Sequence, residues 1–338
     1  MRVMIPVSGE TVNWQDELSR SIRSLDQLLQ ATGNKATDIT GLDFEGHDFP
    51  VRVPLPFVDR IEYGNPADPL LRQVLPLKAE QHQIPSYLAD PLEEEQANPV
   101  TGIIHKYQGR VLLILAGACA INCRYCFRRH FNYQDNLNSL DEWKAALSYL
   151  QANPDINEVI LSGGDPLLNS NERLDALIKA IAAIPNIKRL RIHSRMPIVI
   201  PQRIDNALVH LLTQSGLQVV MVLHANHPNE INQQVALSLQ PLRQAGIMLF
   251  NQAVLLKGVN DHADTLSRLS ETLFAVGVLP YYLHCLDKVQ GAAHFDLPIA
   301  QAKMLAGELS ARLPGYLVPK LVREQAGASS KTLILPRY

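Results

Sequence analysis

Six short apolar runs alternate with segments of helical periodicity after residue 105, and this alternation constrains the fold more than any other feature of the chain. The runs are VLLILAG (111–117), EVILSGG (158–164), KRLRIHS (188–194), LQVVMVLH (217–224), IMLFNQAVLL (247–256) and PYYLHCL (280–286). Apolar runs separated by helices are typical of parallel strands that are buried on both faces of a sheet. We therefore expect six βα units with right-handed crossovers.

Six units do not close a standard barrel, which needs eight. The sequence predicts an α/β fold with an open, partial (β/α)6 barrel, and a doubly wound sheet is the alternative. The functional site lies beyond the carboxyl ends of the strands in both folds, so this alternative does not move the site.

The chain divides into three expected parts, which are an N-terminal helical appendage (1–100), the partial barrel (101–290) and a C-terminal helix with a short tail (291–338). Apolar residues recur at spacings of three and four between Trp14 and Gly33, and they predict one amphipathic helix that ends at Gly33. Prolines cluster between Pro50 and Pro99, where we expect extended segments and short helical turns.

Composition excludes several classes of function. With 338 residues, 46% hydrophobic and 19% charged, the chain can bury a sizeable core. Lys and Arg number 31 against 33 Asp and Glu, so no basic excess indicates a nucleic-acid partner. The N-terminus lacks the apolar core of a signal peptide, and the longest apolar stretch (111–121) is far shorter than the roughly 20 residues of a membrane span. We expect a cytoplasmic protein without a membrane partner.

Polar side chains follow every apolar run, at the end where a site is expected. Each one alone fits an ordinary polar loop, but their convergence from all six units predicts a functional site. They are Cys119, Cys123, Cys126, Gly163, Gly164, Asp165, His193, Arg195, His224, Asn226, His227, Asn251, Gln252, His284 and Asp287.

Three cysteines directly after the first run carry the most chemical information. Cys119, Cys123 and Cys126 have the spacing C-x3-C-x2-C, and thiolates this close can ligate a metal cluster. Two alternatives are buried apolar cysteines and a zinc site with His130 as the fourth ligand. The polar residues between the cysteines argue against simple burial. The size of the chain argues against zinc, because structural zinc stabilises small domains that lack a hydrophobic core and this chain has enough apolar residues to form one. The spacing therefore favours an iron–sulfur cluster with one iron left free for chemistry.

The motif C-x3-C-x-Tyr-C at the end of a first strand resembles the signature of the radical S-adenosylmethionine (SAM) enzymes. From about His105 to Lys331 the chain is similar to the lysine 2,3-aminomutases, and most similar to the short form that prepares β-lysine for modification of elongation factor P. The segments SGGD, HANHPNE, FNQAVLLKGVND and AGASSK add to this resemblance.

The resemblance implies an iron–sulfur cluster and SAM as cofactors. It assigns a [4Fe-4S] cluster to Cys119, Cys123 and Cys126, with SAM bound to the open iron. The residues it places around SAM are Tyr125, Gly163, Gly164, Asp165, His224 and Gln252.

The resemblance also implies pyridoxal 5'-phosphate (PLP), bound to Lys331 as a Schiff base. The tail AGASSK supplies the small-residue loop before this lysine, although the longer enzymes have a glycine run there. The segment HKYQGR offers Lys106 and Arg110 as partners of the cofactor phosphate.

Three charges then specify the substrate by the same resemblance. Arg128 matches the arginine that pairs with the substrate α-carboxylate. Asp287 matches one of two acids that hold the distant ε-ammonium, and Glu324 stands where the family usually has the second acid, an Asp. Two acids favour lysine over glutamate as substrate.

The implied reaction is isomerisation of L-lysine to β-lysine by a radical generated from SAM, with the product supplying modification of elongation factor P. Alternatives are an aminomutase of free-lysine catabolism, one for another amino acid, a radical SAM enzyme without PLP, and a zinc-stabilised binding module. The expected partners are L-lysine, an electron donor protein and the elongation factor P ligase pathway. The oligomeric state stays open, with a homo-oligomer among the alternatives.

Overall fold

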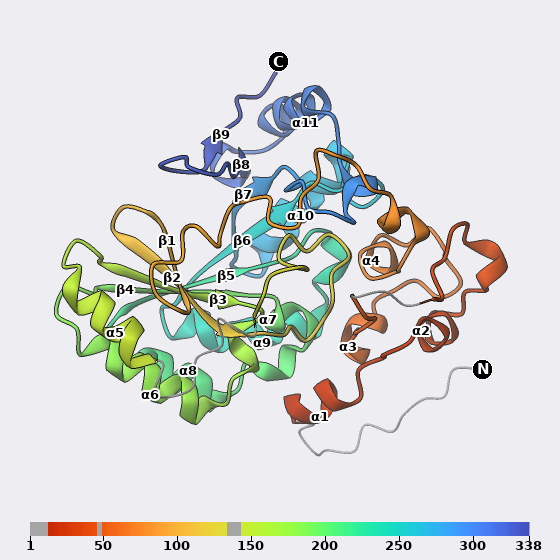
Figure 1. Ribbon diagram of the computed structural model, residues 1–338. Coiled ribbons are helices and arrows are strands. Elements are labelled where there is room, and N and C mark those ends of the chain that lie inside the picture. The colour runs from red at the N-terminus through yellow and green to blue at the C-terminus, as the bar shows by residue number, and fades with distance from the viewer. Residues whose placement is uncertain (1–12, 46–48, 134–142, 338) are drawn as a thin grey trace.

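A single nine-stranded sheet forms the centre of the molecule (Figure 1). The computed structural model describes residues 13–45, 49–133 and 143–337. The strands are β1 (Ile103–Tyr107), β2 (Arg110–Ala116), β3 (Glu158–Gly163), β4 (Arg189–Ser194), β5 (Gln218–Leu223), β6 (Met248–Val254), β7 (Leu279–His284), β8 (Lys320–Arg323) and β9 (Thr332–Leu333). Strands β2 to β8 pair in parallel, whereas β1 and β9 pair antiparallel at the two edges.

Four short helices precede the sheet in the chain, namely α1 (Trp14–Ser19), α2 (Leu25–Thr32), α3 (Leu55–Val58) and α4 (Pro69–Arg72). The helices that connect successive parallel strands are α5 (Trp143–Ala152), α6 (Asn171–Ala182), α7 (Met196–Val199), α8 (Asn206–Thr213), α9 (Gln233–Gln244), α10 (Ala263–Ala275) and α11 (Ile299–Arg312). Local sequence starts several of them, because Ser170, Asp205 and Asn232 each accept a hydrogen bond from a backbone N–H in the first turn of α6, α8 and α9.

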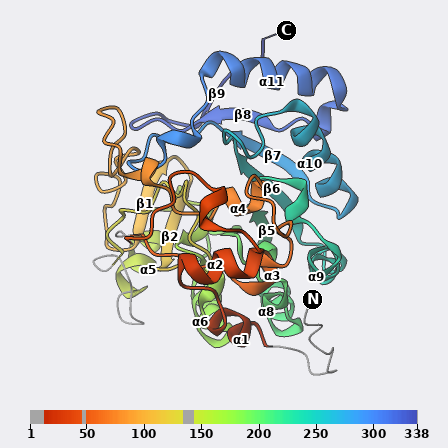
Figure 2. The same cartoon turned by 90° about the vertical axis from the view of Figure 1, so that its right-hand side faces the viewer.

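The strand order distinguishes the two folds that the sequence allowed. A doubly wound sheet reverses its strand order at a switch point, but here every strand lies beside its predecessor in the chain. Figure 2 shows α6, α8, α9, α10 and α11 as an arc around the sheet, with the N-terminal helices α2, α3 and α4 in front, inside that arc. The predicted partial barrel of six βα units, β2/α5 to β7/α11, is confirmed, and the short strand β8 extends it.

The predicted single helix over residues 14–33 is wrong. The helix is interrupted between α1 and α2, where Ile22 and Val53 exchange two backbone hydrogen bonds of 2.8 and 3.0 Å. Ser24 then starts α2 by accepting a hydrogen bond from the Gln27 N–H. Gly33 ends α2 as expected, in the left-handed conformation (φ 69°) that glycine adopts without strain.

The N-terminal segment packs on the barrel rather than beside it. Leu28, Phe57 and Leu70 are fully buried and belong to the same continuous hydrophobic core as residues of the sheet. The division of the chain into three parts at residues 100 and 290 stays a prediction. The N-terminal segment is also bonded to the loop that carries the cysteines.

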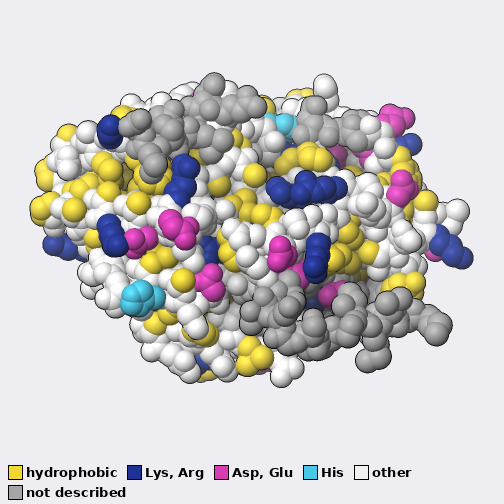
Figure 3. All heavy atoms as spheres, turned by 90° about the horizontal axis from the view of Figure 1, so that it is seen from below, with side chains coloured by type: hydrophobic (Ala, Val, Ile, Leu, Met, Phe, Trp, Pro, Cys, Tyr) yellow, Lys and Arg dark blue, Asp and Glu magenta, His cyan; other side chains and the backbone are white. Residues whose placement is uncertain are grey.

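None of the helices in the described ranges combines the length and the apolar character needed to cross a bilayer. Residues 1–12, on which the prediction about a signal peptide depends, lie outside the described part of the chain. On the face drawn in Figure 3, Lys and Arg side chains are interspersed with Asp and Glu rather than gathered into one patch.

Candidate active site

One large cavity occupies the interior of the barrel and the carboxyl ends of its strands. Its volume is about 1010 Å³, which is at the upper end of the range for small-molecule sites. Every residue that the sequence singled out for a cofactor or substrate lines it. The three cysteines, the residues around the SGGD motif, Asp287, Glu324 and Lys331 therefore share one enclosed space.

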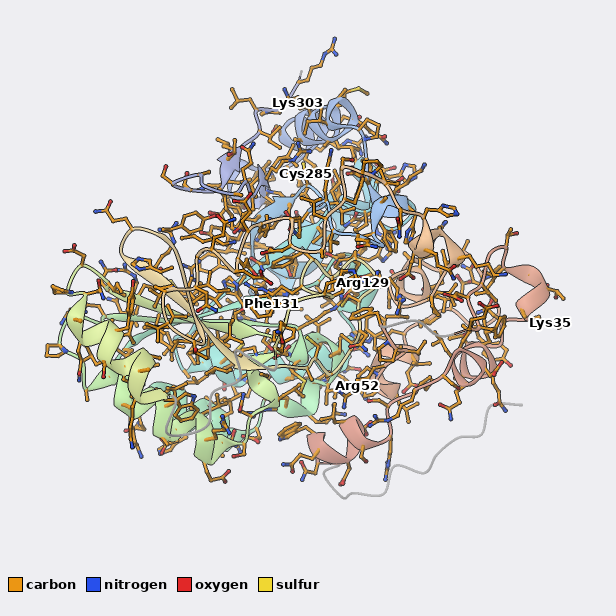
Figure 4. The ribbon with its side chains drawn as sticks, in the orientation of Figure 1. Lys35, Arg52, Arg129, Phe131, Cys285 and Lys303 are labelled. Atoms are coloured by element: carbon orange, nitrogen blue, oxygen red, sulfur yellow. The ribbon has the colours of Figure 1, made fainter. Side chains whose placement is uncertain are left out.

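The loop that carries the cysteines is held by the N-terminal segment. The Asn122 N–H donates to the Arg52 carbonyl, and the Arg124 N–H donates to the Gln73 carbonyl, both at 2.9 Å. Arg52 in turn donates to the Cys119 carbonyl at 3.1 Å. Figure 4 shows Arg52 and Arg129 near this loop, whereas Cys285 lies apart from them towards α11.

Two buried glutamates of the same segment pair with all three arginines of the loop. Glu80 binds Arg124 through two hydrogen bonds of 2.6 and 2.8 Å and Arg129 through one of 2.8 Å. Glu94 binds Arg128 through two, of 2.6 and 2.9 Å. Sequence reasoning missed both glutamates, because each stands in a polar stretch without periodicity and its partner is more than thirty residues away.

The cysteine side chains are partly exposed to the cavity and otherwise surrounded by protein. Burial raises the pKa of the Cys126 thiol to about 11 and raises that of Cys119 well above its ordinary value. An Arg195 N–H donates to Cys123 Sγ at 2.7 Å. The His130 ring Nε2 lies 3.2 Å from the Gln290 carbonyl oxygen, outside the residues that line the cavity.

The glycines of the SGGD motif allow the cysteine loop to approach β3. A Cβ on Gly164 would lie 2.1 Å from the Ala118 carbonyl oxygen, and Gly163 has a φ of +111°. The Gly164 N–H donates to the Ala116 carbonyl at 2.7 Å, which fixes this approach. Glycine is therefore required here at least in part because β3 packs closely against the start of the cysteine loop.

Asp165 connects the ends of β3 and β4. Its carboxylate accepts hydrogen bonds from the Ser194 hydroxyl and from the N–H groups of Leu167, Arg195 and Met196, at 2.7 to 3.0 Å. These four bonds use both oxygens of the buried carboxylate, so Asp165 fixes the loops that face the cavity.

Three further predicted residues come together deeper in the barrel. The Tyr125 hydroxyl accepts from the Asn226 amide at 2.6 Å and contacts Arg195. The Gln252 amide nitrogen lies 2.7 Å from His224 Nε2. Burial lowers the pKa of His224 to about 3, so its ring is neutral and accepts this bond.

A chain of alternating charges connects Arg128 of the cysteine loop to Lys331, at the β8–β9 end of the cavity. Lys106 Nζ lies 3.1 Å from both Glu94 Oε1 and Glu324 Oε1, and Lys331 Nζ contacts Glu324 Oε2. Burial would raise the pKa of Glu324, but Lys331 and Lys106 lower it to about 2. Because Arg128 also pairs with Glu94, the cations Arg128, Lys106 and Lys331 and the carboxylates of Glu94 and Glu324 form one continuous network.

Asp287 lines the same end without belonging to that network. Its Oδ1 is buried and has no hydrogen-bond partner within the described residues. Burial and the negative charge of Glu324 raise the pKa of Asp287 to about 7. Buried Nε2 atoms of His193 and His284 are likewise unpartnered there. Arg110 also faces the cavity and stacks on the Tyr107 ring, 4.6 Å from its centroid.

The chain is similar to several known proteins. The chain matches the Radical SAM superfamily over residues 113–269. It is 49% identical to the L-lysine 2,3-aminomutase of Haemophilus influenzae over 97% of both chains. It is also 49% identical to that of Escherichia coli K12, over 95% of this chain and 94% of the other. A solved radical SAM methyltransferase from Sphaerobacter thermophilus is similar at 16% identity and a TM-score of 0.47, covering 65% of this chain and 68% of that one.

The fold and the cysteine loop are thus those of a radical SAM enzyme. Within this superfamily the chain belongs to the lysine 2,3-aminomutase family, and the protein is an isomerase. The resemblance inferred from the sequence is confirmed. Membership of this family implies a [4Fe-4S] cluster, SAM and PLP as cofactors.

The residues present fit these groups. In the described part of the chain, no group of three or more His, Cys, Asp or Glu side chains is placed to hold a single metal ion, whereas a cluster takes each cysteine on a different iron. The partly exposed thiols become favourable ligands when cationic iron compensates the charge of their thiolates. Lys331 and the unpartnered polar atoms of Asp287, His193 and His284 face a cavity large enough for two organic cofactors and a substrate.

Proposed function

We propose that this protein converts L-lysine to β-lysine by moving the amino group from the α to the β carbon. The observation that carries the proposal is the single cavity that joins Cys119, Cys123 and Cys126 to Lys331 and Asp287. Relatives that are 49% identical over nearly their whole length bear the name L-lysine 2,3-aminomutase.

Each cofactor is assigned to one part of the cavity. The cysteines hold the cluster at one end, Lys331 binds PLP at the other, and Lys106 and Arg110 provide positive charge for its phosphate. When bound, the cluster and SAM supply a hydrogen-abstracting radical, and PLP supplies a trigonal nitrogen through which an amino group can migrate. The residues proposed to enclose SAM are Tyr125, Gly163, Gly164, Asp165, His224 and Gln252.

The protein's own contribution is position and exclusion of water. Arg128 offers a planar fork to the substrate α-carboxylate. The unpartnered Oδ1 of Asp287 offers a site for the ε-ammonium in the cavity that Glu324 also lines. A substrate held at both ends has its α and β carbons fixed between them, which restricts where the radical can react. Enclosure in the barrel keeps water away from that radical.

The decisive experiment is anaerobic. The protein is reconstituted with iron, sulfide and PLP, then incubated with lysine, SAM and dithionite, and β-lysine is measured by chromatography. Accumulation of β-lysine, with no corresponding product from glutamate, supports the proposal. Cleavage of SAM without any rearranged lysine would refute it, and a preparation that holds zinc instead of iron and acid-labile sulfide would exclude the whole class.

We propose further that the product supplies modification of elongation factor P rather than lysine catabolism. The support is the near end-to-end match with the Haemophilus influenzae and Escherichia coli relatives. Transfer of isotopically labelled product to elongation factor P by its ligase tests this, and rejection of the product by the ligase favours catabolism. In the cell, an electron donor protein is proposed to take the role that dithionite has in the assay. The protein is also proposed to form a homo-oligomer, which light scattering would detect.

A further inference from the structure

A strap of the N-terminal segment, residues 84–99, crosses the open side of the barrel and inserts one charged side chain into the cavity. The strap is fixed at both ends. Leu88 pairs with Val289 in a bridge that includes a 2.9 Å bond from the Leu88 N–H to the Lys288 carbonyl. The Tyr87 hydroxyl donates to Asp296 at 2.7 Å, and further along the chain the strap is bonded to the strand β1.

Glu94 is the residue that this strap delivers. Its side chain is 4% exposed, and its two oxygens bond to Arg128 and to Lys106. Burial alone would raise the pKa of Glu94, but the two cations hold it below its ordinary value. Glu94 therefore stays charged and paired.

The bonds between Glu94 and Arg128 determine which edge of the guanidinium remains available. Glu94 accepts from Nε and Nη2 of Arg128, at 2.6 and 2.9 Å. Nη1 lies 3.3 Å from the Ser162 hydroxyl and 3.5 Å from the Gly163 carbonyl. A guanidinium has five N–H donors, and its Nη1–Nη2 edge forms a second fork. Within the described residues, no second carboxylate bonds to Arg128 there.

We propose that Glu94 is a positioning residue, which locks Arg128 so that its Nη1–Nη2 edge receives the substrate carboxylate. This inference depends on the proposed function for the identity of the substrate. Arg128 then bridges two carboxylates, one permanent and one brought by the substrate.

The test separates binding of the carboxylate from binding of the rest of the substrate. Equilibrium dialysis measures the affinity of the reconstituted, unreduced enzyme for lysine and for lysinamide, which lacks the carboxylate. Charge-assisted hydrogen bonds of this kind are worth about 1.5 to 3 kcal/mol, so Glu94→Gln is expected to weaken lysine binding by about 10- to 150-fold. Lysinamide binding, iron content and PLP content should stay unchanged.

Two variants accompany Glu94→Gln. Glu95→Gln is the matched control, because Glu95 is exposed on the same strap, and it should bind lysine as the wild type does. Glu94→Asp keeps the charge on a shorter stem, and it should lose less lysine affinity than Glu94→Gln. If Glu94→Gln does not fold, the affinities for lysine and lysinamide are compared in Glu94→Asp instead.

Equal weakening of both ligands in the Glu94 variants, loss of iron or PLP, or unchanged lysine binding would overturn the inference while leaving the proposed function intact. A wild-type enzyme that binds no lysine would refute the proposed function, and the inference with it.

Discussion

Glu324 and Lys331, seven positions apart in the chain, form an ion pair across the turn between β8 and β9. The pair exists because β9 folds back antiparallel on β8, with Arg323 opposite Thr332. The tail thereby places the lysine in the cavity next to Tyr282, whose ring centroid lies 5.9 Å from Nζ. A lysine close to the C-terminus is ordinarily a surface residue, and the strand pairing turns this one inwards.

Replacement of Lys331 is expected to remove PLP and leave the cluster intact. Lys331→Ala should abolish the absorbance of bound PLP that borohydride removes, and should lower β-lysine formation by more than about 1000-fold, as loss of a covalent catalyst does. Iron content should not change, because the cysteines follow β2, whereas Lys331 directly precedes β9 at the far edge of the sheet. Lys320→Ala is the control, since Lys320 is exposed on β8. Pyridoxyl found on another lysine by peptide mapping would contradict the assignment.

Three of the four cysteines are expected to bind the cluster, and the fourth, Cys285, is expected to be structural. Replacing Cys119, Cys123 or Cys126 with Ala should each eliminate the brown chromophore and most of the iron. Cys285→Ala should keep both, because Cys285 is buried in the hydrophobic core and does not line the cavity. Its loss should lower the free energy of unfolding by about 1 kcal/mol, as is usual for a single core substitution. Iron and sulfide analysis after anaerobic purification decides, and iron retained in all three loop variants contradicts the ligand assignment.

Gly164 offers a test of the packing between β3 and the cysteine loop. A methyl group there would lie 2.1 Å from the Ala118 carbonyl oxygen, so the backbone before Cys119 must move. Gly164→Ala should cost about 1 to 3 kcal/mol, as overpacking does, and should reduce iron content. Gly315→Ala is the matched control, because nothing lies within 4 Å of its added carbon. Thermal unfolding and iron analysis measure both effects, and an unchanged Gly164→Ala protein would refute this account.

The sequence could predict the barrel and most candidate residues because their signals are local. Each apolar run ends in the polar residues of its own loop, and the spacing of the cysteines is contained in eight positions. The strands β8 and β9 escaped prediction because four and two residues are too few to show a pattern. The break between α1 and α2 also escaped it, since Ile22 leaves helical geometry to pair with the distant Val53.

The residues that hold the site could not be read from the sequence for a different reason. Glu80 and Glu94 act on arginines that lie 34 to 49 positions further along the chain. Gln73 reaches the amide of Asn226 over 153 positions. In the sequence these residues are indistinguishable from solvated polar residues. Only the fold shows that the N-terminal segment closes over the cysteine loop and neutralises its charges.

The carboxyl of Asp287 should impose a pH dependence on the use of lysine. Burial and the neighbouring carboxylate of Glu324 raise its pKa to about 7, against the opposing charges of Lys331 and Lys106 and with a further contribution from Glu94. Only the ionised carboxylate attracts an ammonium, and it predominates above pH 7. One pKa unit corresponds to about tenfold in population, so kcat/KM for lysine should rise by about tenfold per pH unit below 7 and level off above it.

Asp287→Asn isolates this effect, because the amide has nearly the same shape and does not titrate. The variant should lose the rise of kcat/KM between pH 6 and 7, and its kcat/KM for lysine at pH 8 should fall by about 10- to 1000-fold, since a substrate cation loses one of two carboxylate partners. SAM cleavage should change less, because Asp287 follows β7, whereas the cysteines follow β2 and four strands lie between them in the sheet. The measurement is a pH series of initial rates for both proteins under anaerobic conditions. Parallel pH profiles in the two proteins would show that another group controls the encounter with lysine, and that the ε-ammonium is held elsewhere.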